Sequence, residues 1–195
     1  MIEFAAGKYC ISINDEPDFN MYSSDNKIYD NVLVLTKKTD YSRTISLEVE
    51  KGGMIKTAAF VIPYYTPRDD FYITLDDEHI LFMFDNYICI FELSSIRIIN
   101  SKLIEHSGTM FAIYPYKDEF IIYGEMEIFK INKELSVIWS FGGRDIFVTC
   151  NSDINPFTMK ADRICLYDFS ENYYEINYNG KLLTDMPNTN MESKK

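Results

Sequence analysis

Three segments of this sequence begin alike at a nearly constant spacing, and this repeat constrains the fold more than any other feature. Each segment starts with a charged pair and continues into an apolar run, as in Asp77–Phe82, Asp118–Tyr123 and Asp162–Tyr167. The starts lie 41 and 44 residues apart. A second, aromatic-rich run follows each time, at Tyr87–Phe91, Glu127–Ile131 and Tyr173–Tyr178. Several short strands that recur at this period are typical of the blades of a β-propeller.

Period-two alternation indicates antiparallel strands in the rest of the chain as well. Arg43–Glu50 places Ile45, Leu47 and Val49 on one face, which is the pattern of a half-buried strand. Turn residues separate such runs, and Asn179-Gly180 predicts a two-residue hairpin turn with positive φ angles at both positions. We therefore expect an all-β, antiparallel protein.

One repeat has a recognisable blade pattern. Ile128–Phe141 combines an alternating strand, the polar turn Asn132-Lys133-Glu134 and a strand that contains Trp139. This segment resembles a blade of the PQQ-type and related β-propellers. The resemblance extends over residues 71–185 and implies a propeller-like fold, but it implies no cofactor.

From these patterns we expect a small or partial β-propeller of three to four blades, with a β-sandwich as the alternative. Residues 1–62 form an N-terminal β segment, which is either a divergent blade or a small separate sheet. Residues 71–185 form three propeller-like repeats, and residues 186–195 form a flexible tail. In residues 94–106, apolar side chains recur at helical spacing, so a short helix is the alternative there.

The sequence offers few residues for catalysis or metal binding. It has two histidines, His79 and His106, and each has an ordinary structural explanation in a strand start or a loop. No cysteine pair or histidine pair has the spacing of a zinc site. We expect four reduced core thiols, no catalytic residue, no metal and no cofactor; the cysteines are Cys10, Cys89, Cys150 and Cys165.

The charge is strongly negative and unevenly distributed. The net charge is −11, and residues 76–130 hold ten acids but four bases. Such a chain repels nucleic acids and anionic membranes and attracts a cationic partner. The start of the chain, Met1-Ile2-Glu3-Phe4, lacks the basic and apolar regions of a secretory signal, so we expect a cytoplasmic protein.

These features favour a non-enzymatic protein whose acidic, tyrosine-rich surface occupies a basic protein partner. One concrete version is a bacterial immunity protein that neutralises a nuclease-type toxin, to which the chain is similar in size, acidity and lack of catalytic residues. Tyr64-Tyr65, Tyr114–Tyr116 and Tyr173-Tyr174 are tyrosine pairs suited to an interface or a ligand groove. The expected partner-binding residues are Asp76, Asp77, Glu78, Tyr114, Tyr116, Asp118, Glu119, Glu125 and Glu127.

Two other functions stay open. The first is a propeller domain that binds a small molecule or a carbohydrate and has weak hydrolase activity, which would need acids and aromatics converging on one pocket. The second is a scaffold piece of a larger assembly.

Overall fold

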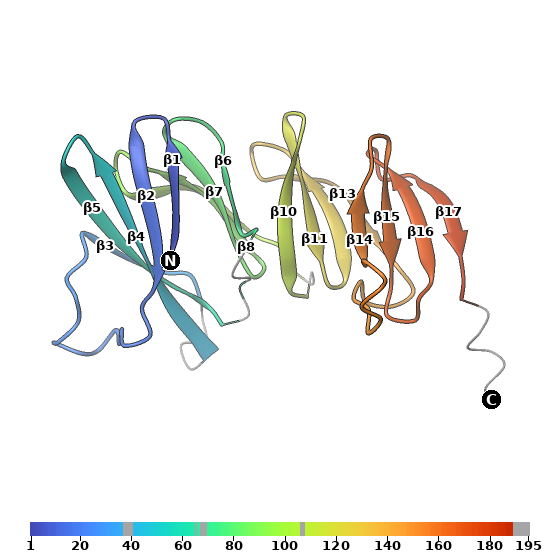
Figure 1. Cartoon of the computed structure of the whole chain (residues 1–195), viewed down its shortest axis with the longest axis horizontal. Helices are drawn as coiled ribbons and strands as arrows, with labels where there is room; N and C mark the ends of the chain where they lie inside the picture. Colours follow the sequence, from blue (N-terminus) through green and yellow to red (C-terminus); the bar gives the residue numbers. More distant parts are fainter. Residues whose placement is uncertain (37–40, 65, 67–69, 106–107, 189–195) are drawn as a thin grey trace. The chain divides into compact units, whose positions relative to one another are not determined.

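The computed structural model describes residues 1–36, 41–64, 66, 70–105 and 108–188, and this part of the chain forms seventeen β-strands and no α-helix (Figure 1). Fifteen of these strands pair only with antiparallel neighbours. The exception is the parallel pair β3 (Asn31–Val34) and β5 (Met54–Pro63). The predicted fold class, all-β with antiparallel sheets, is confirmed.

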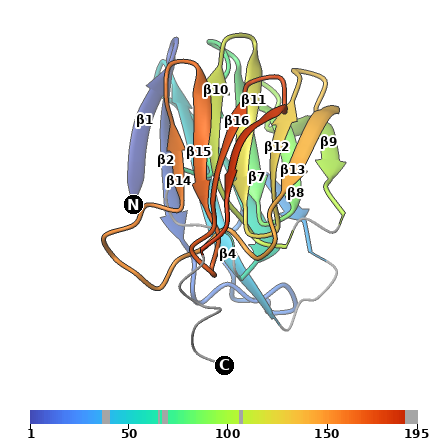
Figure 2. The same cartoon turned by 90° about the vertical axis from the view of Figure 1, so that its right-hand side faces the viewer.

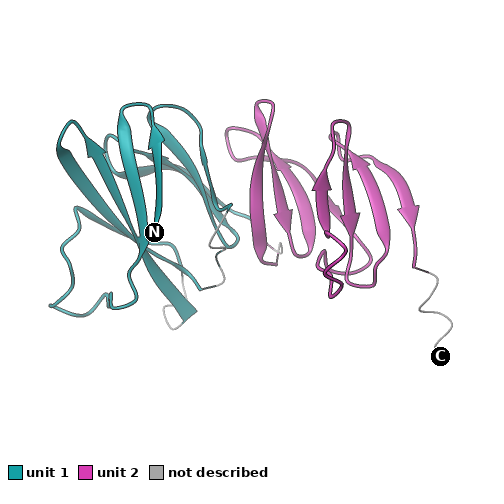
Figure 3. Ribbon diagram, viewed as in Figure 1, with its two compact units in different colours: residues 1–104 teal, residues 105–195 magenta. Residues whose placement is uncertain are grey.

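The chain divides into two compact units, residues 1–104 and residues 105–195 (Figure 3). Each unit contains two sheets. The division into residues 1–62, 71–185 and 186–195 that we expected from the sequence stays a prediction, and residues 189–195 of the expected tail lie outside the described part.

The first unit contains sheets A and B. Sheet A has five strands, in the spatial order β1 (Ile2–Ala6), β2 (Tyr9–Asp15), β4 (Ser42–Lys51), β5 and β3. Sheet B has four strands, in the order β6 (Tyr72–Thr74), β7 (His79–Phe84), β8 (Tyr87–Glu92) and β9 (Arg97–Leu103).

An apolar core lies between sheets A and B. As the alternation predicts, Ile45, Leu47 and Val49 of β4 are buried. The fully buried ring of Phe60 in β5 has its centroid 5.3 Å from that of Phe91 in β8. Burial of such large rings is the main source of stability in a β-sheet pair, and it holds the two sheets face to face.

The short helix considered for residues 94–106 is wrong, because this segment contains the edge strand β9. β9 pairs with β8 from Arg97 to Leu103. Ile96 is buried in the turn before it, with φ of 55°, whereas Ile99 is exposed. The helical spacing therefore does not mark one buried face, and backbone pairing with β8 decides the structure.

The second unit contains sheets C and D, with four antiparallel strands each. Sheet C has the order β10 (Met110–Tyr116), β11 (Glu119–Gly124), β12 (Glu127–Ile131) and β13 (Val137–Gly142). Sheet D has the order β14 (Phe157–Met159), β15 (Arg163–Tyr167), β16 (Tyr173–Asn177) and β17 (Leu182–Met186). In sheet D, β14, β15 and β16 run side by side (Figure 2).

The hairpin between β16 and β17 differs from the two-residue turn that Asn179-Gly180 predicted. Gly180 has φ of 79°, but the main-chain NH of Gly180 donates to the oxygen of Asn177, and the NH of Asn177 donates to the oxygen of Lys181. The loop is therefore one residue longer than expected, with glycine in the left-handed position at its end. The side-chain oxygen of Asn177 also accepts from the NH groups of Asn179 and Lys181, which favours the longer loop.

Candidate functional site

The first group of predicted partner-binding acids lies in the loop before β7. The carboxylate of Asp76 accepts hydrogen bonds from the main-chain NH groups of Glu78 and His79, at 2.8 and 2.9 Å. It also lies 2.9 Å from Nδ1 of His79. These bonds lower the pKa of Asp76. Asp76 therefore organises this loop, and its side chain still exposes 58% of its surface.

Glu78 connects this loop to the hairpin of β1 and β2. Its carboxylate pairs with the ammonium of Lys8 at 2.7 Å and accepts from the Tyr9 hydroxyl at 2.7 Å. Both contacts lower the pKa of Glu78. The side chain of Asp77 packs against Gly7, where an added Cβ would lie only 2.6 Å from it. Two of the three predicted acids are therefore in contact with the neighbouring sheet of the same unit.

The second group lies around β10, β11 and β12 of the other unit. Asp118 forms an exposed ion pair with Lys133 at 2.8 Å. Glu119 forms an ion pair with Lys130, which is only 6% exposed. The carboxylate of Glu125 accepts from the main-chain NH of Thr109 at 3.3 Å.

Glu127, the last acid of this group, is half-buried, and its Cγ lies 3.6 Å from the position of a Cβ at Gly142. It thus packs along the neighbouring strand β13. The nine predicted residues fall into two units, three in the first and six in the second, and they stay a prediction.

The two predicted tyrosine anchors belong to the contact between sheets C and D. The ring of Tyr114 stacks on Phe157, with centroids 5.2 Å apart. The ring of Tyr116 stacks on Tyr178, with centroids 3.8 Å apart. Both tyrosines are half-buried, so much of each ring is in contact with residues of the same unit and is not open to a partner.

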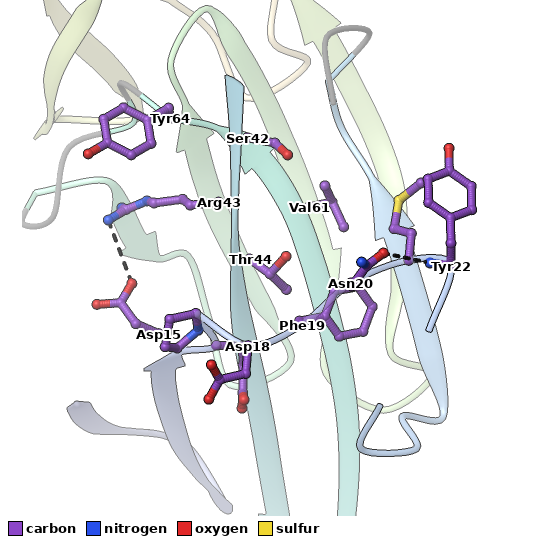
Figure 4. Close-up of a pocket in the computed structure, with 13 residues that line it drawn as sticks. Asp15, Asp18, Phe19, Asn20, Tyr22, Ser42, Arg43, Thr44, Val61 and Tyr64 are labelled. Atoms are coloured by element: carbon purple, nitrogen blue, oxygen red, sulfur yellow. Dashed lines mark hydrogen bonds and ion pairs between the residues drawn. The ribbon is translucent and has the colours of Figure 1, made fainter. Parts of the chain in front are cut away.

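A groove of about 870 Å³ opens on sheet A, and sequence reasoning missed it. We call it the acidic groove, because three carboxylates and one guanidinium are among its lining groups: Asp15, Glu16, Asp18 and Arg43. Figure 4 shows Arg43 pointing toward Asp15, and the two form an ion pair at 3.6 Å. Arg43 also donates to the main-chain oxygen of Thr66 at 3.1 Å, which fixes the guanidinium. The acids belong to the end of β2 and the following loop, outside the repeats of residues 71–185.

A second groove, of about 770 Å³, lies in the same unit and is lined mainly by apolar atoms. We call it the apolar groove. It is formed by the ends of β3, β5 and β9 and by the turn between β7 and β8. Tyr41 and Tyr64 line it and expose 69% and 62% of their surface. Tyr64 lines the acidic groove as well, and Tyr65, the other member of the predicted pair, lies outside the described residues.

Other features bear on the chemistry. Among the residues that the structure describes, no cluster of three or more histidine, cysteine or acidic side chains could hold a metal ion. The described part also holds no helix of the length and apolarity needed to cross a membrane.

The expectation of four core thiols is wrong for two of them, because Cys10 and Cys150 are exposed. Burial raises the pKa of Cys89, and His106 lies outside the described residues.

No protein-family model and no curated protein sequence matches the chain. Among solved structures, it is similar to the Cps50 (Swd1) β-propeller domain of Myceliophteria thermophila, with a TM-score of 0.49, 12% identity, and coverage of 76% of this chain and 56% of that one. It is also similar to the Pan2 WD40 domain of Neurospora crassa, with a TM-score of 0.43, 12% identity, and coverage of 64% and 37%. The chain thus spans between about a third and somewhat over half of these domains. At such identities a likeness concerns the fold only.

Proposed function

We propose that this protein is a non-enzymatic protein-binding protein whose acidic surface occupies a cationic protein partner. The observation that supports this proposal is the excess of acidic over basic side chains, together with the ion pairs that the basic side chains form within the chain. Seven basic side chains in the described residues form ion pairs with carboxylates of the same chain: Lys8, Lys27, Arg43, Lys130, Lys133, Arg144 and Arg163. The chain has thirty acids and nineteen bases, so eleven negative charges stay uncompensated.

This excess charge favours one class of partner. Long-range attraction accelerates encounter with a positively charged protein, and it opposes binding to nucleic acids and to anionic membranes. Of the acids predicted from the sequence, Asp76 and Asp118 expose 58% and 89% of their side chains and are the best placed to meet such a partner.

A concrete form of this function is the neutralisation of a basic toxin in the bacterial cytoplasm, as immunity proteins do. Carboxylates that mask the cationic active site of a nuclease would suffice for inhibition. The role requires no catalytic group in this chain, and it agrees with the size and acidity of the protein.

The test is to express the adjacent reading frame of the genome alone and together with this chain. We expect its product to be basic and to inhibit growth, and we expect co-expression to restore growth. A complex of the two proteins should form at low salt and dissociate at high salt. An acidic product, or growth inhibition that co-expression does not relieve, would contradict this function.

A second candidate is a domain that binds a small molecule or a carbohydrate. The volume of the acidic groove, about 870 Å³, supports it, because small-molecule pockets have about 300 to 1,000 Å³. Arg43 and the carboxylates around it would supply the polar contacts. Binding in a glycan array, or hydrolysis of an activated glycoside, that the Asp18→Asn substitution abolishes would favour this function over the first.

A further inference from the structure

We propose that the acidic groove and the apolar groove, which Tyr64 joins, form one docking site for a basic, extended segment of the protein partner. A large apolar side chain of that segment enters the apolar groove, while a lysine or arginine beside it meets the carboxylates of the acidic groove. This inference rests on the proposed function, and it names both the surface and the kind of partner segment.

The apolar groove gathers large side chains that are exposed to solvent. Tyr41, Tyr64, Val34 and Leu103 line it and expose 69, 62, 47 and 44% of their surface. Single exposed apolar residues are ordinary, but several on one concave surface indicate an interaction site. Tyrosine is also an effective anchor, because its ring buries a large area at a small entropic cost.

The acidic groove supplies the charge that selects a basic segment. Its lining groups include three carboxylates and one guanidinium. Asp15 exposes 59% of its side chain, although it pairs with Arg43. Asp18 is exposed as well, and the nearest approach of Glu16 to the ammonium of Lys27 is a long 4.0 Å. An incoming lysine or arginine would therefore find carboxylate oxygens that are still open to solvent.

Tyr64 connects the two halves of the docking site, because it lines both grooves. All lining residues of both grooves belong to the first compact unit. A partner segment with an apolar side chain next to a basic one would thus reach both grooves at once.

Charge complementarity decides between the possible occupants. A second copy of this chain carries a net charge of −11 and would be repelled from the acidic groove. The same repulsion opposes a nucleic acid backbone or an anionic membrane. A basic protein segment with an apolar anchor is the occupant that both grooves fit.

The test uses the full chain, labelled for NMR, and two short probe peptides. The first peptide alternates lysine and serine around one central phenylalanine, and the second has serine in place of the phenylalanine. We expect the first to bind at least about tenfold more tightly, because it buries one aromatic side chain more. Its addition should shift the signals of Tyr41, Tyr64 and Leu103.

Matched variants separate the contributions of the two grooves. Tyr64→Ala should remove the difference between the two peptides. Ile55→Ala should leave it unchanged, since Ile55 lies at the other end of β5 and is equally exposed, at 62%. Asp18→Asn should weaken binding of both peptides, whereas Asp153→Asn, an exposed acid of the second unit, should have a smaller effect for the same change in net charge.

The outcomes distinguish this inference from the proposed function. Equal binding of the two peptides, or shifts confined to other surfaces such as the Asp118 turn, would overturn the docking site but leave attraction to a basic partner intact. Binding of neither peptide at low salt would also overturn the docking site. The growth-rescue experiment would then decide on the proposed function by itself.

Discussion

The ammonium group of Lys130 donates a hydrogen bond to the main-chain oxygen of Tyr178, 3.1 Å away, although the two residues lie 48 positions apart in the chain. The indole Nε1 of Trp139 donates to the same oxygen at 3.1 Å. Lys130 and Trp139 belong to sheet C, and Tyr178 follows the third strand of sheet D. One carbonyl oxygen thus joins the two sheets of the second unit, and the ion pair with Glu119 completes the environment of the buried ammonium.

The pair of Glu119 and Lys130 should contribute more to stability than the neighbouring pair of Asp118 and Lys133. Glu119→Gln would leave a largely buried ammonium without its carboxylate, and it should lower the free energy of unfolding by about 1–3 kcal/mol. Asp118→Asn breaks an ion pair in which both side chains are more than 60% exposed, so it should cost at most about 1 kcal/mol. Urea unfolding followed by the fluorescence of Trp139, the single tryptophan, compares the two variants. Equal losses would contradict the structural role of Glu119.

Gly180 cannot be replaced without cost for two reasons: its φ is positive, and its Cα lies close to Trp139. Gly53 shares only the first of these features, so it serves as a control. The φ of Gly180 is 79°, and an added Cβ would lie 2.7 Å from the ring of Trp139. Gly53 has φ of 83° but open space around it. Gly53→Ala should cost about 1 kcal/mol of stability through backbone strain alone, whereas Gly180→Ala should cost at least about 1 kcal/mol more through the steric clash.

The measurement is again urea unfolding, read by circular dichroism for both variants. The fluorescence of Trp139 should change in the folded state of Gly180→Ala, because the indole must move. If the two substitutions cost the same, the contact between Gly180 and Trp139 does not restrict this loop.

Acidic pH should lower the folding stability of the first unit, because Glu78 becomes protonated. Contacts with Lys8 and Tyr9 hold the pKa of Glu78 below its ordinary value of 4.5. A carboxyl group whose pKa is lower in the folded state stabilises that state above its unfolded pKa, and this contribution is lost as the pH falls below it. Glu78→Gln should therefore make the loss of stability between about pH 5 and about pH 3 less steep.

Urea unfolding by circular dichroism at a series of pH values measures this slope. Lys8→Met should have the same effect, because it removes the group that lowers the pKa most. Slopes that are unchanged in both variants would show that the contact between the β1–β2 hairpin and the β6–β7 loop does not couple stability to pH.

The repeated strands could be predicted from the sequence, because their signals are local. The starts at Asp77, Asp118 and Asp162 each precede the second strand of a four-stranded sheet, and a continuous apolar run marks each of these strands as buried on both faces. The helix considered around Ile99 failed because the pairing of an edge strand depends on a neighbour, β8, that lies earlier in the chain. The parallel pairing of β3 with β5 is non-local in the same way.

The candidate site was predictable only in part. A sequence shows which segments are acidic, but it does not show that Glu78 meets Lys8, 70 positions away, or that Glu119 meets a buried lysine. Tyr64 was one of the tyrosines expected at an interface, and it is exposed. Tyr114 and Tyr116 lie in a similar tyrosine-rich sequence, yet their rings stack against residues of sheet D. Their exposure is decided by the packing of β10 against sheet D, which the local sequence does not show.

The central claim is that excess negative charge draws a cationic protein to this chain. The most direct test is the association rate constant between the full chain and the product of the adjacent reading frame, measured by stopped flow from about 20 to about 500 mM salt. The charge excess predicts that the association rate falls at least about tenfold over this range while the dissociation rate changes little. An association rate that does not depend on salt would contradict the claim.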